Sequence, residues 1–176
     1  WEVVGVGLKP TPTAGSGQGY LLVIDLEGYR EAVERQIRDI LALCRGEGAQ
    51  EVAVLEGTEQ AHLWPALRDF SRAILAADPW AVGLKASVPI SEVENILRAA
   101  EEVARARELA CAVIAHAGSN VLYPFFSDSA RRVEILAQAI ADMQARVREA
   151  GGHLMVKWAP RTLKERVAVW GEPRPD

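Results

Sequence analysis

The order of strand-like and helix-like segments between Ala81 and Trp158 constrains the fold of this chain most strongly. Alternating apolar residues indicate strands, and apolar residues at spacings of three and four indicate amphipathic helices. By these rules the region predicts strand, helix, strand, strand, helix, strand. That order is the split βαβ unit, with helices on one face of an antiparallel sheet. We therefore expect an α+β fold: a ferredoxin-like α/β sandwich with a mostly antiparallel sheet.

Local signals place the segments of this unit. Strands are expected at residues 81–88, 111–116, 121–123 and 153–158, and helices after residue 91 and over 129–150. Ser91 and Glu94 predict a capping box at the start of the first helix. Gly118 lies in the turn of a hairpin formed by the second and third strands. Gly151 and Gly152 are expected to end the long helix.

The part of the chain before Ala81 predicts elements that extend the same layers. Strands are expected at residues 1–8, 20–26 and 51–55, and helices over 29–45 and 63–74. Pro65 is compatible with the second helix only in its first turn. Glycines 15, 17 and 19 do not form a dinucleotide-binding loop, because a strand and not a helix follows them. No linker divides the chain, so residues 1–176 predict one domain.

Composition excludes some classes of function. The net charge of −4 and the pI near 5.5 argue against a nucleic-acid partner, which requires a basic surface. The hydrophobic fraction of 49% is enough for a substantial core. The only cysteines, Cys44 and Cys111, lie among apolar residues and predict buried free thiols in a reducing cytoplasm. No apolar run reaches the length of a membrane span.

An ordered set of short segments resembles the C-terminal domain of FAD-linked oxidases, the family that includes D-lactate dehydrogenases and glycolate oxidase. Those segments are Leu63–Arg68, Lys85–Pro89, His116–Tyr123, Gly151–Leu154 and Trp158–Pro160. The resemblance covers nearly the whole chain from Tyr20 to Gly171. Among the branches of the family, the chain is most similar to the FAD-binding subunit of the glycolate oxidase complex.

The resemblance implies a function and its partners. In the family, an N-terminal domain binds most of the FAD, and the C-terminal domain caps the flavin and helps to bind a 2-hydroxy acid. The chain is thus expected to be the cap domain of a longer flavoprotein, beginning after the FAD domain and inactive by itself. Other subunits of a glycolate-oxidase-like complex are expected partners, in the cytoplasm or peripheral to the inner membrane.

The resemblance also implies a change at the metal site. Metal-using members carry a His-x-Gly-Asp-Gly-Asn-x-His motif and a later Glu-His pair. His116 matches the first histidine, but Ser119 and Tyr123 stand where the aspartate and the second histidine would be. Lys157 and Trp158 take the places of the Glu-His pair. An ammonium ion repels a divalent cation and one imidazole cannot hold it, so no tightly bound metal is expected.

Three residues are candidates for the site. Arg68 matches the family arginine that binds the substrate carboxylate, and a surface arginine paired with a nearby aspartate is the alternative. Lys157 is expected to bind substrate as well. His116 has the intrinsic pKa of a catalytic base, and the alternative is a structural histidine bonded to the hairpin backbone.

A second class of function is open. Ferredoxin-like sheets also serve as ligand-binding or protein-interaction modules without catalysis, and exposed tryptophans such as Trp158 and Trp170 would suit that role. A hydrolase finds no support, because the chain lacks a nucleophile elbow and a His-Glu-x-x-His motif.

Overall fold

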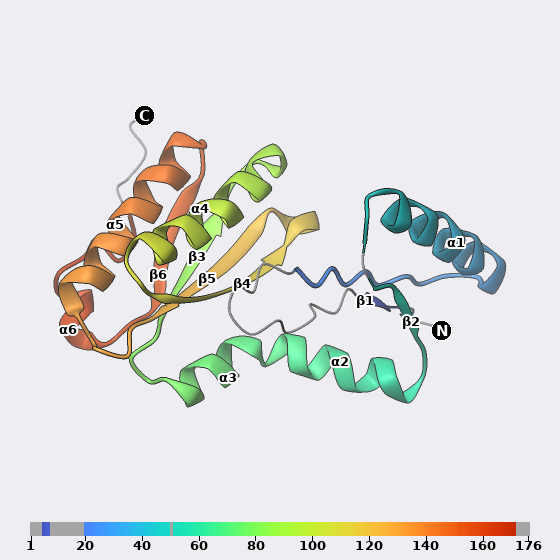
Figure 1. Cartoon of the computed structure of the whole chain (residues 1–176), viewed down its shortest axis with the longest axis horizontal. Helices are drawn as coiled ribbons and strands as arrows, with labels where there is room; N and C mark the ends of the chain where they lie inside the picture. Colours follow the sequence, from blue (N-terminus) through green and yellow to red (C-terminus); the bar gives the residue numbers. More distant parts are fainter. Residues whose placement is uncertain (1–4, 8–19, 50, 172–176) are drawn as a thin grey trace. The chain divides into compact units, whose positions relative to one another are not determined.

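The computed structural model describes residues 5–7, 20–49 and 51–171 and divides into two compact units, residues 1–69 and 70–176. Each unit is described by itself, and Figure 1 shows the elements of both. The predicted α+β class is confirmed, because helices accompany a four-stranded sheet in which every neighbouring pair is antiparallel. The expectation of one C-terminal domain over residues 1–176 stays a prediction.

The first unit combines two short strands and two helices. Its elements are β1 (Gly5–Gly7), α1 (Arg30–Gly46), β2 (Ala53–Leu55) and α2 (Thr58–Arg68). β1 and β2 pair antiparallel. The strand predicted at residues 20–26 is wrong, because this apolar segment joins no ladder in the described structure, and a strand needs a partner as well as β-favouring residues. The predicted loop at residues 9–19, with its glycines, lies outside the described residues.

The helix predicted over residues 63–74 is two helices. α2 ends at Arg68 and α3 (Phe70–Ala77) begins two residues later, at the boundary between the units. Pro65 lies inside α2, not in its first turn as predicted, because α2 begins earlier, at Thr58. A proline inside a helix removes one backbone hydrogen bond, and α2 ends three residues after it.

The second unit has the predicted element order from its first strand onwards. Its elements are α3, β3 (Val82–Ser87), η1 (Ile90–Glu92), α4 (Val93–Ala106), β4 (Ala110–His116), η2 (Ala117–Ser119), β5 (Val121–Ser127), α5 (Val133–Glu149), β6 (His153–Trp158) and α6 (Arg161–Lys164). The strand order in the sheet is β4-β5-β3-β6. Figure 1 shows α4 and α5 side by side over one face of this sheet, and both helices contact its strands.

The core of the second unit lies between this first face of the sheet and the two helices. Alternate strand residues point into it, as the pleat of a strand requires. The buried strand residues are Val82, Leu84, Ala86, Leu122, Phe126, Leu154 and Val156. The helices contribute Ile96, Ala99, Ala100, Val103, Leu136, Ala139, Ile140, Met143 and Val147. Both helical sets follow the predicted spacing of three and four.

Two helix starts differ from the predictions. α4 begins at Val93 after the short η1 turn, and no side chain caps it, so the capping box of Ser91 and Glu94 is wrong. The η1 turn supplies backbone hydrogen bonds instead. α5 begins at Val133 instead of residue 129, because a turn closed by a hydrogen bond from Arg131 N–H to the Asp128 carbonyl precedes it.

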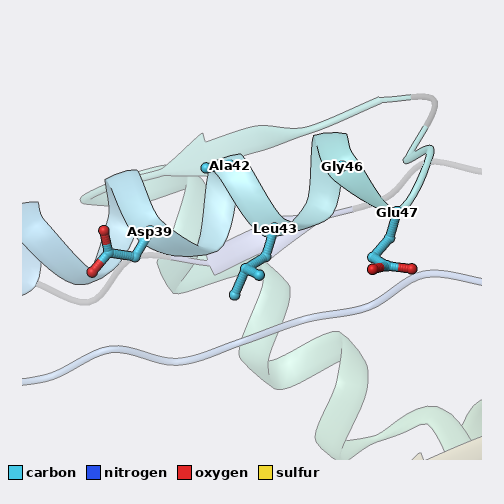
Figure 2. Close-up of a pocket in the computed structure, with 5 residues that line it drawn as sticks. All are labelled: Asp39, Ala42, Leu43, Gly46 and Glu47. Atoms are coloured by element: carbon cyan, nitrogen blue, oxygen red, sulfur yellow. The ribbon is translucent and has the colours of Figure 1, made fainter.

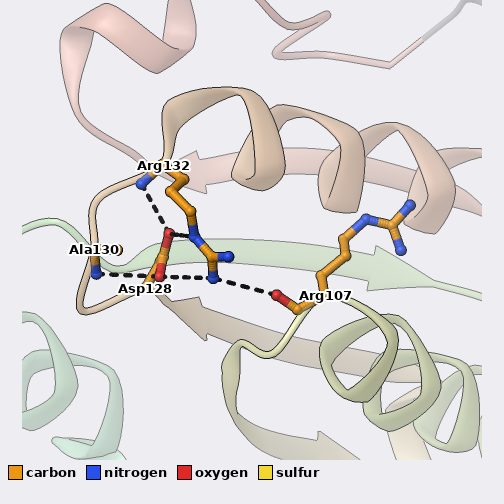
Figure 3. A network of polar contacts seen from close by, with 4 residues as sticks. All are labelled: Arg107, Asp128, Ala130 and Arg132. Carbon is orange, nitrogen blue, oxygen red and sulfur yellow. Dashed lines mark hydrogen bonds and ion pairs between the residues drawn. The ribbon is translucent and has the colours of Figure 1, made fainter.

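Asp128 is a buried charged residue that joins β5 to α5 (Figure 3). Its side chain accepts hydrogen bonds from the backbone N–H groups of Ala130 (3.2 Å) and Arg132 (2.8 Å). It also accepts two from the Arg132 guanidinium, Nε at 2.8 Å and Nη2 at 3.1 Å. Nη2 donates as well to the carbonyl oxygen of Arg107 at the end of α4 (3.3 Å). The Arg132 hydrogen bond is the main cause that lowers the pKa of Asp128 to about 2.

Both cysteines are free thiols, but the prediction that both are buried is wrong for Cys111, which is exposed on the edge strand β4. Its sulfur lies 3.9 Å from the carbonyl oxygen of Ala100 in α4. Desolvation of the sulfur, with a smaller contribution from Glu101, raises its pKa to about 11, so little thiolate forms at neutral pH. In the described part of the chain, no helix combines the length and hydropathy that a membrane span requires.

Asp128→Asn is expected to destabilise the protein by about 2 kcal/mol at neutral pH, because the charge-assisted hydrogen bonds weaken. The native carboxylate has its pKa lowered from 3.8 to about 2. Its stabilisation is therefore complete above the unfolded-state pKa and is lost as the pH falls from about 4 towards 2. Urea unfolding at several pH values measures both effects. Asp69→Asn, at an exposed carboxylate, is the control. Equal acid sensitivity of D128N and wild type would contradict this account.

Candidate functional site

The sheet face opposite α4 and α5, called here the second face, gathers most of the residues that the sequence singled out. His116 and Tyr123 lie on it because β4 and β5 pair in a register that sets His116 opposite Val121 and Ile114 opposite Tyr123. Lys157 reaches the same face from β6, two strands away from β5. The second face is therefore the candidate functional site.

Aromatic rings cover one end of the second face. The rings of Phe125 and Trp158 are stacked, with centroids 5.7 Å apart and an interplanar angle of 23°. Phe70 of α3 meets Phe125 edge-on at 6.1 Å. Gly83 of β3 lies against this stack, and a Cβ atom there would come within 2.5 Å of Trp158 and 2.7 Å of Phe125. Glycine is thus required for the rings to close over β3.

A β-bulge decides which face Trp158 occupies beside Lys157. Gly83 pairs with Trp158, whereas the next residue, Leu84, pairs with Val156. Lys157 is consequently the extra residue on β6, and the shift brings Trp158 onto the second face beside Phe125. Without the bulge, strict alternation would place Lys157 and Trp158 on opposite faces.

The Lys157 ammonium ion lies against two rings on this face. Its Nζ atom is 4.4 Å from the centroid of the Trp158 ring and 5.0 Å from that of Tyr123. Both distances are in the range of cation–π attraction. Because Tyr123 is on β5 and Lys157 on β6, the lysine side chain spans the intervening strand β3.

His116, at the end of β4, lies next to the Tyr123 ring. Its ring meets the Tyr123 ring edge-on, with centroids 5.8 Å apart and an interplanar angle of 90°. The side chain is exposed, and within the described residues its imidazole forms no hydrogen bond to the hairpin backbone. The turn is completed instead by Asn120, which adopts a left-handed conformation (φ 59°) and accepts a hydrogen bond from the Val88 N–H.

Arg68 lies in the first unit, at the last residue of α2. Its side chain is 75% exposed, and its Nε is 3.8 Å from an oxygen of Asp69. This is the surface pairing that the sequence left as an alternative, and such exposed pairs contribute little to stability.

The charged residues within the strands of this sheet are both lysines. None of the strands β3, β4, β5 and β6 contains an aspartate or glutamate, and their charged residues are Lys85 and Lys157. Lys85 is two residues after Gly83 in β3, and side chains two apart in a strand point to the same face, so Lys85 also lies on the second face. Asp78, outside the strands, accepts a hydrogen bond from Ser127 at the end of β5. In a chain of net charge −4, this face favours anions.

The residues of this face do not fit a divalent metal ion. No group of three or more histidine, cysteine, aspartate or glutamate side chains that could hold a metal occurs among the described residues. His116 contacts the Tyr123 ring, which also lies against the Lys157 ammonium ion, and an ammonium ion has no lone pair for a metal. We therefore derive no chemical step through a metal.

A hollow elsewhere contains none of the candidate residues. It lies along α1 and has a volume of about 530 Å³. Its lining residues are Asp39, Ala42, Leu43, Gly46 and Glu47, and Figure 2 shows the side chains of Asp39, Leu43 and Glu47 along one helix. With two carboxylates and a lining from one helix, it offers no convergent groups for a small anionic ligand.

Sequence reasoning missed Gly83, Phe70 and Phe125, and it missed the bulge. The predicted strand ends at Tyr123, whereas β5 continues to Ser127. The spacing of two residues between Tyr123 and Phe125 would have signalled that both rings share a face. The bulge has no such signal, because the residues of β6 alternate as they would in a regular strand.

Comparisons with known proteins agree with the resemblance noted above. The family model for the C-terminal domain of FAD linked oxidases matches residues 8–156. Glycolate oxidase subunit GlcD of Bacillus subtilis (strain 168) is 29% identical over 136 residues, which cover 75% of this chain and 29% of that protein. The chain thus spans less than a third of the length of this relative.

Gly83→Ala is expected to destabilise the protein by about 1–3 kcal/mol, because the new methyl group forces the two rings apart. The near-ultraviolet circular dichroism of the tryptophans should change with it. Gly118→Ala is the matched control, since a Cβ atom there meets nothing within 4 Å. If both variants unfold at the wild-type urea concentration, Gly83 does not support the ring stack.

Metal analysis of the purified chain is expected to find no stoichiometric zinc, iron or manganese, because Tyr123 and Lys157 offer no ligand set with His116. Elemental analysis by plasma mass spectrometry, after dialysis without chelator, measures this. One equivalent of any of these metals, lost in His116→Ala, would overturn the prediction.

Proposed function

Since the chain belongs to the family of C-terminal domains of FAD-linked oxidases, we propose that it caps the flavin in an oxidoreductase that oxidises glycolate or another 2-hydroxy acid. The relative named as a glycolate oxidase subunit supports this substrate class. The observation that carries the proposal is the second face, where His116 and Lys157 each contact the Tyr123 ring on strands that contain no carboxylate.

The proposed roles follow from the chemistry of the reaction. Oxidation of a 2-hydroxy acid removes the hydroxyl proton to a base and the α-hydrogen as hydride, leaving a 2-oxo acid. FAD, when bound, supplies the hydride acceptor. His116 is proposed as the base, because its exposed imidazole forms no hydrogen bond within the described residues. Lys157 is proposed to bind the substrate carboxylate. Arg68, which belongs to the first unit, stays a predicted carboxylate-binding residue.

The second face suits a cap better than a complete cofactor site. A sheet surface that carries the rings of Tyr123 and Trp158 can cover one side of a planar isoalloxazine, but it encloses nothing. We propose that an N-terminal domain of the same polypeptide binds the FAD, and that this chain alone is inactive. The proposed partners are other subunits of a glycolate-oxidase-like complex, in the cytoplasm or at the inner membrane.

A second candidate is a binding or interaction module without catalysis. Trp170 is 70% exposed and Ile90 is 68% exposed, and large exposed apolar side chains suit a contact with another protein. Flavin content discriminates between the two candidates, because only the first requires a flavoprotein.

The test is anaerobic reduction of the flavin. The natural polypeptide that carries this chain, purified alone and with its complex partners, is expected to show flavin absorbance that bleaches with glycolate, D-lactate or a related 2-hydroxy acid. Absence of flavin absorbance from both preparations would sink the proposal in favour of the interaction module.

His116→Gln is expected to slow flavin reduction by about 100- to 10,000-fold without loss of bound flavin, since it removes the base. Stopped-flow absorbance measures the rate. His62→Gln, at an exposed histidine of α2, is the matched control. A wild-type rate in H116Q would show that His116 is not the base.

A further inference from the structure

Lys157 is held by rings and not by a carboxylate. Its ammonium nitrogen lies 4.4 Å from the Trp158 ring and 5.0 Å from the Tyr123 ring. Within the part of the chain that the structure describes, it forms no ion pair. Aromatic rings attract a cation through their quadrupole but carry no net charge, so the ammonium ion keeps its full charge for another partner.

The strands around Lys157 leave that charge uncompensated. Its strand β6 and the other three strands of the sheet contain no acidic residue. Lys85, on the adjacent strand β3, adds a second positive charge to the same face. Two lysines on neighbouring strands that contain no carboxylate favour the approach of an anion.

The position of the ammonium ion is set by the backbone as well as by the rings. Strand alternation places Lys157 on the second face with Met155, and the bulge brings Trp158 onto that face beside it. Gly83, the residue that pairs with Trp158, has no side chain. The lysine can therefore cross β3 and reach the Tyr123 ring on β5. A long, flexible side chain is restricted in this way before any ligand arrives, which lowers the entropy cost of binding.

We propose that Lys157, Tyr123 and Trp158 form a carboxylate-binding site that works without a metal ion, and that the two rings position the ammonium group. Lys157 supplies the charge, and Tyr123 and Trp158 are positioning residues. The inference deepens the proposed function and rests on it for one point only, that the natural carboxylate is a 2-hydroxy acid. The site itself requires neither flavin nor oxidation.

The test is a titration of the whole 176-residue chain, without flavin and with EDTA present, followed by NMR. Sodium glycolate and sodium acetate are the probes, and sodium chloride at equal ionic strength is the reference. The Lys157 side-chain signals should start at high field, because two ring currents act on them. They are expected to move and to saturate with both carboxylates but not with chloride. Identical shifts with chloride, or no shift at all, would overturn the proposal.

Three variants separate the roles. Lys157→Gln is expected to abolish the saturable response, which Trp158 signals report, whereas Lys164→Gln, the same charge change on α6, should leave it intact. Tyr123→Leu should weaken binding by about two- to fivefold, because it removes one cation–π contact. Tyr123→Phe keeps the ring and should bind as wild type does. Equal weakening by K157Q and K164Q would show general charge attraction and overturn the site.

The outcomes distinguish this proposal from the proposed function. If glycolate and acetate bind at Lys157 but the natural flavoprotein does not oxidise 2-hydroxy acids, the carboxylate site stands and the proposed function fails. If oxidation occurs but Tyr123→Leu leaves both carboxylate affinity and the Lys157 shifts unchanged, the ring-positioned site fails and the proposed function stands. A Trp158 variant is not used, because its ring also packs on Phe125.

Discussion

Burial of one face of the four-stranded sheet under α4 and α5 is the constraint on which the second unit depends. Side chains alternate between the faces of a strand, so a shift of one residue would expose the whole apolar set. The antiparallel register is therefore fixed across all four strands by core residues such as Leu84, Leu122 and Ile140. The Asp128 hydrogen bonds then fasten the last part of β5 to the start of α5.

Because of the same alternation, the other residues of each strand point to the second face, where they do not take part in the core. Tyr123 and Phe125 occupy second-face positions of β5 because Leu122 and Phe126 occupy the core positions. At β6 the register changes by one residue, which places both Lys157 and Trp158 on the second face. The bulge interrupts the regular hydrogen bonding between β3 and β6, but with it the Lys157 ammonium ion lies over two rings.

Sequence reasoning predicted the regular elements of the second unit well and its irregular ones poorly. The hairpin around Gly118 and the two long helices are confirmed, because their apolar spacing is strong and their turns contain glycine. The capping box at Ser91 and the strand at residues 20–26 are wrong, since a cap depends on local backbone geometry and a strand depends on a partner. The site residues His116, Lys157 and Arg68 came from the family resemblance, and the structure brings the first two onto one face with Tyr123.

The sequence by itself determined the α+β class, the order of the elements in the second unit, and membership of the family of C-terminal domains of FAD-linked oxidases. These properties depend on the spacing of apolar residues along the chain and on which residue stands at each position. Only the tertiary structure decided that Lys157 lies between the Tyr123 and Trp158 rings, beside Gly83. That arrangement arises from strand register and a bulge, and both depend on how distant segments pair, which no local pattern records.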